Sequence, residues 1–398
     1  MISGCTFWLE NGSPKGPLFL QHSQEVKLVH PKEDGAIHMS KGETLRLSCM
    51  DKKFKYFNTK DLVVTCVQDD YVEVKKQLMQ FVELECEAYP TSIIRKRHET
   101  CSENGRLYEI GYNIRGEFRL VMVVCFVQSE ARTLYAFINN TYPSVNNPPS
   151  YHFPTTSFQD DNLYDFNIAE TYTQKYQREE FGTLLQSNVQ AVRFIREDGK
   201  HLLISGPLVA ASYFVRGYEK AATLHYLNTA PQWGIIKNGN WRKVENKVRG
   251  RLIEGGDKFA LMSGTYGVAT LPDNQNVERD LFLYRDEKSQ RFHPVPKFFW
   301  KLIYDKEHRT GEVIIVVNNP YLKEITDSYY LCKDICSEIK WLGMKRNSIS
   351  KGYVYCCKME DFLEATGIEN VFADRVTSPE ISTPTEAANC DELHLGFC

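Results

Sequence analysis

The sequence lacks the features that would place it in several large classes at once. No apolar run approaches the length of a membrane span, and residues 1–5 lack the charged and apolar regions of a signal peptide. A Gly-rich phosphate loop, a His-Glu-x-x-His metal motif and a Gly-x-Ser-x-Gly nucleophile elbow are all missing. These absences argue against membrane partners, P-loop enzymes, zincin-type proteases and α/β-hydrolases. We expect Met1 to be an initiator added to a mature chain.

An excess of charge of either sign is also missing. The 398 residues include 48 Lys and Arg against 51 Asp and Glu, which gives a formal net charge of −3 at pH 7. Any binding of a polyanion must therefore come from a local basic patch. Hydrophobic residues make up 42% of the chain, enough for a soluble globular protein with two or three domains.

Cysteine is absent from the middle of the chain, since none of the twelve lies between Cys125 and Cys332. An even number in the outer parts, with Asn-x-Ser/Thr sequons at Asn11 and Asn139, predicts several disulfides in a secreted protein. Zinc is the alternative for the four cysteines of residues 332–357, although two adjacent cysteines bind one tetrahedral ion awkwardly. The pairing of the cysteines cannot be read from the sequence.

Residues 1–142 are predicted to form a cysteine-rich, β-rich N-terminal domain. Strand-like runs at 45–49, 62–66 and 120–126 end in or next to a cysteine and are separated by polar turns. That pattern suits strands that disulfides hold at their ends. The basic run 95–97 could contact phosphates, although a short charged run is more often a solvated loop.

The rest of the chain is predicted to hold one larger domain between two irregular segments. Prolines and polar residues at 143–154 indicate a linker, because proline extends neither a helix nor a central strand. Over 155–373, long apolar runs such as 297–304 and 313–317 with short connections suit an antiparallel sheet with flanking helices, the α+β class. The polar, acidic residues 374–398 are predicted to form a flexible tail.

A helix is predicted from Trp241 to about Ile253, with Asn240 capping its first turn and Gly255-Gly256 ending it. It carries an apolar stripe at helical spacing: Trp241, Val244, Val248 and Leu252. A polar set falls on the neighbouring face at i, i+3 and i+7 and is expected to point into a cleft: Arg242, Glu245 and Arg249.

Spaced motifs that include this helix carry a family resemblance. The chain presents, in order, Ile204-Ser205-Gly206-Pro207, then Asn228-Thr229-Ala230-Pro231-Gln232, then Lys237, and then Trp241, Glu245 and Arg249. This order resembles the DNA/RNA non-specific endonucleases, in which Asp-Arg-Gly-His precedes Asn-x-x-Pro-Gln, an Asn, and a helix with Trp, Glu and Arg. The resemblance implies a ββα-metal-type endonuclease fold, with an antiparallel sheet core and flanking helices, preceded by a disulfide-rich β domain.

Two chemically active positions of that family differ here. The family's general base is the His, and its single protein ligand to Mg²⁺ is the Asn; Pro207 and Lys237 stand at these places, and Ser205 stands where the Arg would be. A proline cannot take a proton from water, and a lysine ammonium cannot ligate Mg²⁺, which prefers oxygen donors. The resemblance therefore implies no intact catalytic residue and no metal site.

Four residues match polar positions of the family's site. Glu245 matches the Glu that orients the metal's waters and Arg249 the Arg that steadies developing charge, while Asn228 and Gln232 match polar residues of the floor. Plainer alternatives exist for each. Glu245 and Arg249 are spaced as a helix ion pair worth ~0.3–0.5 kcal/mol. Asn228 and Gln232 could only satisfy backbone groups at a strand end.

Residual catalysis stays open in two ways. His201 and His225 are the nearest imidazoles that could replace the base, although each lies in a strand-like run where a histidine more often packs or pairs locally. Mg²⁺ could also still be held by Glu245 through waters.

We hypothesise that the Lys237 ammonium takes the space of the metal and presents its charge to the same phosphate. A basic strip accompanies it over residues 237–251, with Glu245 as the only acid: Lys237, Arg242, Lys243, Lys247, Arg249 and Arg251. Phosphate contacts dominate nucleic-acid affinity and carry no sequence information. The alternative for Lys243, Lys247 and Arg251 is an ordinary solvated helix face.

The function predicted from these residues is binding of DNA and RNA without sequence preference and with little or no hydrolysis. No cofactor is expected, apart from Mg²⁺ if some nuclease activity remains. The chain also resembles a secreted, salivary branch of the family in blood-feeding arthropods, which implies an extracellular protein that meets host blood components. The alternatives are a weak Mg²⁺-dependent endonuclease and a module that binds a host protein.

Overall fold

A computed structural model describes residues 4–8, 15–23, 26–30, 32, 34–139, 158–214 and 216–368. The predicted linker at 143–154 and tail at 374–398, together with Asn11, lie outside the described residues. No helix in the described part of the chain is both long and apolar enough to cross a membrane.

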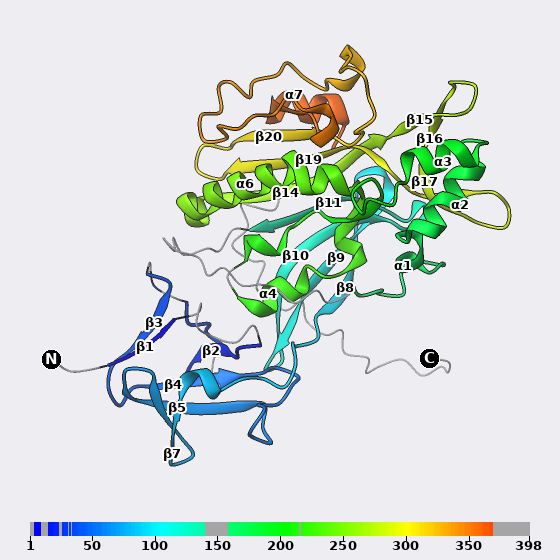
Figure 1. Cartoon of the computed structure of the whole chain (residues 1–398). Coiled ribbons are helices and arrows are strands. Elements are labelled where there is room, and N and C mark those ends of the chain that lie inside the picture. The colour runs from blue at the N-terminus through cyan, green and yellow to red at the C-terminus, as the bar shows by residue number, and fades with distance from the viewer. Residues whose placement is uncertain are drawn as a thin grey trace, which may run out of the picture.

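The largest element is an antiparallel sheet of eight strands in the order β21-β20-β19-β14-β11-β10-β9-β8 (Figure 1). Its strands are β8 Ile93–Cys101, β9 Gly105–Ile114, β10 Glu117–Val127, β11 Arg132–Asn139, β14 Phe259–Val268, β19 Pro296–Asp305, β20 Thr310–Val317 and β21 Val354–Lys358. Helices flank this sheet, so the α+β prediction is confirmed.

This sheet crosses the predicted domain boundary at residue 142. Strands β8–β11 lie in the part assigned to the N-terminal domain, yet β11 pairs with β14 from Tyr135 opposite Gly264 to Asn139 opposite Ala260. Backbone hydrogen bonds and a shared core join the two sides, so the predicted boundary between residues 1–142 and 155–373 is wrong. The strands before and after residues 143–154, β11 and β14, thus belong to one sheet.

A smaller sheet forms a separate layer at the bottom of Figure 1. Its five strands have the order β2-β4-β5-β6-β7, and a further antiparallel pair, β1 with β3, lies beside it. The bounds are β1 Cys5–Trp8, β2 Leu18–Gln21, β3 Ala36–Met39, β4 Thr44–Ser48, β5 Asp61–Gln68, β6 Tyr71–Val74 and β7 Gln77–Gln80. The predicted β-rich, disulfide-bearing N-terminal layer is therefore present, but it ends before β8.

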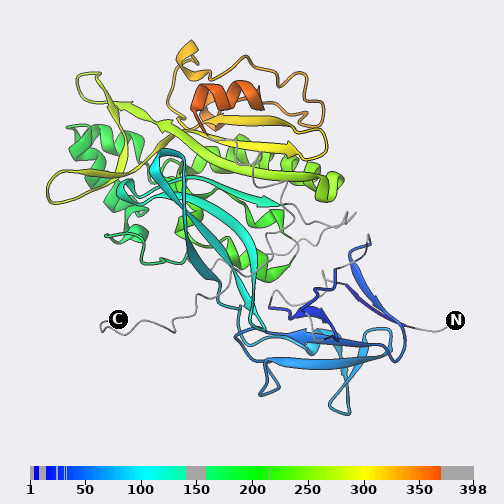
Figure 2. The same cartoon turned by 180° about the vertical axis from the view of Figure 1, so that it is seen from behind.

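Both faces of the central strands of the eight-stranded sheet are buried, which explains why these strands read as long apolar runs, whereas the edge strand β8 is mostly exposed. On β19, Phe298 and Trp300 enter the core of one face, whereas Phe299 enters the core of the other. The second face carries α2 (Gln174–Leu184), α3 (Asn188–Phe194) and α6 (Arg242–Gly255). The first carries α7 (Met359–Thr366), the orange helix of Figure 2.

The remaining elements are short. They are α1 (Ile168–Thr171), α4 (Gly217–Ala222), α5 (Gly234–Ile236), and the strand pairs β12 (Leu203–Pro207) with β13 (Thr229–Trp233), β15 (Thr270–Pro272) with β16 (Glu278–Asp280), and β17 (Phe282–Arg285) with β18 (Arg291–Pro294). The pair β12–β13 leads through α5 and a π-helix at Lys237–Trp241 straight into α6. Most candidate residues of the sequence motifs lie on this path.

The start of α6 differs from its prediction. The apolar stripe is completely buried as expected, and Gly256 ends the helix at a positive φ of 58°. Asn240, however, does not cap a first turn, because the π-helix runs continuously into α6. Gly239 bends this π-helix where a Cβ atom would come within 2.6 Å of the Lys351 carbonyl oxygen, so only glycine fits.

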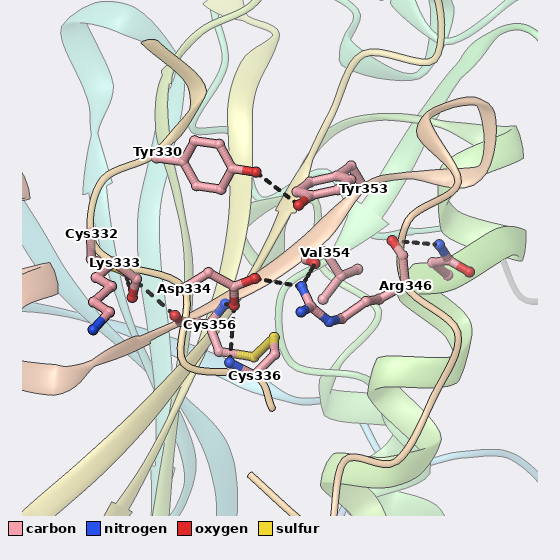
Figure 3. Close-up of polar contacts among 10 residues, drawn as sticks. Tyr330, Cys332, Lys333, Asp334, Cys336, Arg346, Tyr353, Val354 and Cys356 are labelled. Atoms are coloured by element: carbon pink, nitrogen blue, oxygen red, sulfur yellow. Dashed lines mark hydrogen bonds and ion pairs between the residues drawn. A yellow bond between two sulfur atoms is a disulfide. The ribbon is translucent and has the colours of Figure 1, made fainter. Parts of the chain in front are cut away.

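Five disulfides hold the described part of the chain together. They are Cys5–Cys66, Cys49–Cys86, Cys101–Cys125, Cys332–Cys357 and Cys336–Cys356. Within the described residues, the one group of side chains spaced to hold a metal is Asp334, Cys336 and Cys356, and its two sulfurs are bonded to each other (Figure 3). The disulfide prediction is confirmed, and the zinc alternative is wrong.

The last disulfide belongs to a clamp on the entrance of α6, drawn in Figure 3. Asp334 Oδ1 accepts hydrogen bonds from the backbone N–H groups of Cys336 (2.9 Å) and Cys356 (3.2 Å), while Oδ2 accepts from Arg346 (2.6 Å). The Asn240 amide in turn donates to the carbonyls of Gly352 (2.7 Å) and Arg346 (3.4 Å). The disulfide-bonded segment thus fixes the π-helix that carries Lys237.

One lysine lies completely inside the core. Lys301 on β19 takes a position on the helix-bearing face, where its ammonium donates to the Leu208 carbonyl (2.8 Å) and to Ser263 Oγ (3.0 Å). The ammonium also lies 5.0 Å from the ring centre of Tyr213 and 4.9 Å from that of Trp241. Burial lowers the pKa of Lys301 to about 7, although the Glu245 carboxylate opposes this shift.

Asn240→Ala should destabilise the protein by about 1–3 kcal/mol, because the buried Gly352 carbonyl loses its amide donor. Asn238→Ala is the matched control, since Asn238 lies two residues away on the same π-helix and is exposed. Urea unfolding under non-reducing conditions measures the difference. Equal stability of the two variants would show that the clamp does not hold the π-helix.

Lys301→Met should change how stability depends on pH. The unfolded chain holds the Lys301 proton up to its ordinary pKa, whereas the folded chain releases it from about 7 upward. The unfolded state therefore binds more protons between these values, and this lysine makes the free energy of unfolding rise with pH. Relative to the variant, the natural chain should gain on the order of 1–2 kcal/mol between about pH 7 and about pH 9. Urea unfolding at both pH values measures this gain. An equal change in the free energy of unfolding for the natural chain and the variant would contradict the prediction.

Candidate nucleic-acid interface

The motif residues that differ from the family pattern lie on the pair β12–β13. Ser205 stands opposite Pro231, and Pro207 stands opposite Thr229. Both Ser205 and Pro207 are half-buried. The strand continues into Leu208, whose backbone bonds Lys301, so this edge is anchored directly to the main sheet.

A close ion pair occupies the centre of the candidate site. The Lys237 ammonium lies 2.6 Å from Glu245 Oε1 and 2.7 Å from Oε2, so it bonds both oxygens of one carboxylate. The two side chains are only 17% and 8% exposed, respectively. The expected alternative of a Glu245–Arg249 helix pair is wrong, because the Glu245 carboxylate pairs with Lys237 instead.

Lys301 lies beneath this pair and is coupled to it. Glu245 raises the pKa of Lys301 and Lys237 lowers it, while burial has the largest effect and brings the value to about 7. Because Lys301 has no exposed surface, it supports the site from below and does not meet a ligand. Sequence reasoning missed this role, although a lysine inside the apolar run 298–303 was a visible signal.

A second positive centre lies further along α6. Arg249 is half-buried, and its Nε is buried without a hydrogen-bond partner among the described residues. Burial and the neighbouring Arg249 charge together lower the pKa of Lys220 on α4 to about 8. Two cations that repel each other in this way favour an anion between or beside them. Nothing in the sequence around Lys220 indicated that it would lie beside α6.

The rest of the basic strip is more varied. Arg242, Lys243 and Lys247 are exposed on α6, and Lys243 donates to Asn240 Oδ1 at 3.2 Å. Arg251 is half-buried, with its guanidinium 4.5 Å from the ring centre of Phe259. Three cations of the strip are thus open to solvent on one helix.

Asn228 and Gln232 are both completely buried. The Asn228 amide bonds three backbone groups, namely the N–H of Val209 (3.0 Å) and the carbonyls of Val209 and Thr223 (3.0 Å each). It therefore fulfils the plainer alternative of satisfying backbone groups. Gln232 lies against Gly206, and neither of its amide atoms has a hydrogen-bond partner in the described part of the chain.

The two histidines considered as replacement bases are both held by carboxylates. His225 is buried, with Nε2 2.6 Å from Ser92 Oγ and Nδ1 2.8 Å from Asp161 Oδ1, so both ring nitrogens are engaged. His201 bonds Asp198 across the turn that precedes β12. His225 thus links Ser92, the residue before β8, to Asp161, and it has no free ring nitrogen for a water molecule.

Several known proteins resemble this chain in sequence or in fold. It is 26% identical over 364 residues to the salivary endonuclease of Lutzomyia longipalpis, a match covering 89% of this chain and 81% of that protein. It is 25% identical over 352 residues to the salivary protein Tsal2A of Glossina morsitans morsitans, covering 87% and 86%. A chain of the EndoG/EndoGI complex superposes with a TM-score of 0.34 and 15% identity, over 58% of this chain and 83% of that chain.

A family model describes most of the same region. The model of the DNA/RNA non-specific endonucleases matches residues 103–362, which is more than half of the chain. This range contains β12, β13 and α6, and therefore every motif residue discussed above. The chain belongs to the DNA/RNA non-specific endonuclease family.

Proposed function

We propose that this protein binds DNA and RNA without sequence preference and hydrolyses them little or not at all. The observation that carries the proposal is the Lys237–Glu245 pair, in which an ammonium bonds both oxygens of the carboxylate at 2.6 and 2.7 Å. The charge that a metal would supply in this family is here part of the polypeptide.

The residues present do not fit a Mg²⁺ site. Mg²⁺ needs oxygen donors in near-ideal octahedral geometry. The position that supplies an oxygen in the family carries the Lys237 ammonium, and both oxygens of the nearest carboxylate, Glu245, already accept hydrogen bonds from it. A divalent cation would have to displace a cation from a pair that is about nine-tenths buried on its acidic side.

The general base is missing as well. Pro207 has no proton acceptor in its side chain, and both ring nitrogens of the buried His225 are engaged by Ser92 and Asp161. General base catalysis contributes about 10²–10⁴-fold to rate, and metal polarisation of the phosphate contributes several kcal/mol more. Together the two losses leave at most a trace of hydrolysis.

Binding depends on charges that are retained. Arg242, Lys243 and Lys247 are exposed on α6, and Arg249 lies beside Lys220. Lys237 keeps one N–H for a phosphate oxygen after its two bonds to Glu245. Such contacts are indifferent to base sequence, so affinity should fall steeply with salt.

The setting proposed is the saliva of a blood-feeding arthropod. Five disulfides require an oxidising compartment, and the relatives cited above are named as salivary proteins. Nucleic acids released in host blood are the polyanions that such a protein would meet.

A second candidate function is weak Mg²⁺-dependent cleavage. It is favoured by the relative named a salivary endonuclease, which is 26% identical to this chain. Cleavage in Mg²⁺ that EDTA and Glu245→Ala both abolish would establish it. Capture of a host plasma protein that persists after nuclease treatment would instead support a protein-binding module.

A mobility shift with and without EDTA tests the role of Lys237. The natural chain should bind equally in both conditions. Lys237→Glu should weaken binding about tenfold in both, and lower the salt slope by about one, because it adds negative charge beside Glu245. Lys237→Asn should make binding depend on Mg²⁺, because it restores the family's oxygen ligand and frees the Glu245 carboxylate.

Lys288→Glu is the charge control, since Lys288 is exposed at the turn between β17 and β18. It should leave binding within about twofold of the natural chain. Loss of binding by the natural chain in EDTA, or no binding at low salt, would overturn the proposal.

A further inference from the structure

A second hollow lies outside the candidate interface and shares none of its residues. It encloses about 720 Å³ between the end of α3, the hairpin β15–β16, the start of β19 and the loop 319–329. Figure 1 shows α3 beside β15 and β16, away from most of α6. We call it the α3 cleft, and its volume is in the range of ligand-binding pockets.

Four basic side chains from three separate segments line the α3 cleft: Arg193, Arg196, Lys297 and Lys323. None of them forms an ion pair with a carboxylate of the described residues. Neighbouring arginines behave differently, since Arg178 pairs with Glu197 and Arg285 with Glu180. The cleft therefore gathers cations that the protein leaves unneutralised.

Neutral groups hold two of these cations in place. The Lys297 ammonium donates to the Ser328 carbonyl at 2.9 Å and lies 4.2 Å from the ring centre of Tyr329. The Arg196 guanidinium lies 5.8 Å from the ring centre of Tyr321. Carbonyls and aromatic faces orient a cation without cancelling its charge. Burial also lowers the pKa of Lys297, as expected of an ammonium without an acidic partner.

Two acids reduce the positive charge but do not reverse it. Glu278 and Glu324 also line the α3 cleft, and both are exposed. Four cations against two carboxylates leave the lining with a net charge of +2. The lining thus combines an excess of positive charge with three aromatic rings, of which Phe194 is buried and Tyr321 and Tyr329 are partly exposed.

This combination is typical of sites for single-stranded nucleic acid, where cations follow phosphates and aromatic side chains meet bases. We propose that the α3 cleft binds a short single-stranded segment of DNA or RNA, with phosphates on Arg196, Lys297 and Lys323 and a base beside Tyr321 or Tyr329. A hollow of this size admits a few nucleotides and not a duplex. The identity of the polyanion rests on the proposed function.

The test measures fluorescence anisotropy in EDTA with two probes, a fluorescein-labelled single-stranded oligonucleotide and a hairpin duplex of equal length. Arg196→Glu with Lys323→Glu should weaken binding of the single strand at least about tenfold and lower its salt slope by about two. Binding of the duplex should change less than about threefold. The milder pair Arg196→Gln with Lys323→Gln should give a smaller loss in the same direction.

Lys41→Glu with Lys60→Glu, both exposed in the N-terminal layer, controls for the change in net charge. Thermal unfolding should match in all three double variants and the natural chain. Single-strand affinity of the Glu pair within about twofold of this control, or an equal loss of affinity for the duplex, would overturn the α3 cleft proposal. If the natural chain binds neither probe, both the proposed function and the cleft proposal are overturned. If Lys237→Glu weakens binding but the cleft variants do not, only the cleft proposal is overturned.

Discussion

The site is organised around one ion pair between Lys237 and Glu245. Removing one partner of a buried pair leaves an uncompensated charge, a loss of roughly 3–5 kcal/mol, so the two residues must be placed together. Their placement depends on the π-helix, because it lets a residue that precedes α6 reach a carboxylate inside α6. Beneath them Lys301 bonds Leu208, and beside them Asn240 ties the π-helix to the disulfide-bonded segment.

Under the proposed function, this arrangement separates two properties that a metal nuclease combines. In such an enzyme the same site binds the phosphate and activates water. Here the fixed ammonium of Lys237 contributes positive charge without an exchangeable coordination sphere, and Pro207 offers nothing that accepts a proton. The basic residues Arg242, Lys243, Lys247 and Arg249 lie on the same helix as Glu245. Under the proposed function, nucleic-acid binding and the loss of hydrolysis therefore have separate structural origins.

The sequence predicted those parts of the structure that leave a local pattern. The stripe from Trp241 to Leu252 predicted α6 because burial repeats with the helical period, and the apolar runs of β19 and β20 predicted sheet strands. Pairing of β11 with β14 was not predictable, because strand pairing across more than one hundred residues leaves no local signal. The same holds for Lys220 and Lys301, whose roles follow from neighbours that only folding provides.

The motif residues show the same division. Spacing alone placed Glu245 and Arg249 on one helix, but not the partner of Glu245, which comes from across a kink at Gly239. Asn228 matched a site residue by position, yet its amide is fully used by Val209 and Thr223. Position in a motif therefore identifies a place in the fold, and the hydrogen-bond partners decide what the side chain does there.

The most direct measurement of the central claim is the binding of Mn²⁺, as a paramagnetic stand-in for Mg²⁺, followed by electron paramagnetic resonance on the purified, disulfide-intact chain. If the Lys237 ammonium takes the place of the metal, the natural chain should leave the Mn²⁺ signal as that of the free ion, and Lys237→Asn should bind one ion. One Mn²⁺ bound by the natural chain and lost in Glu245→Ala would contradict the account.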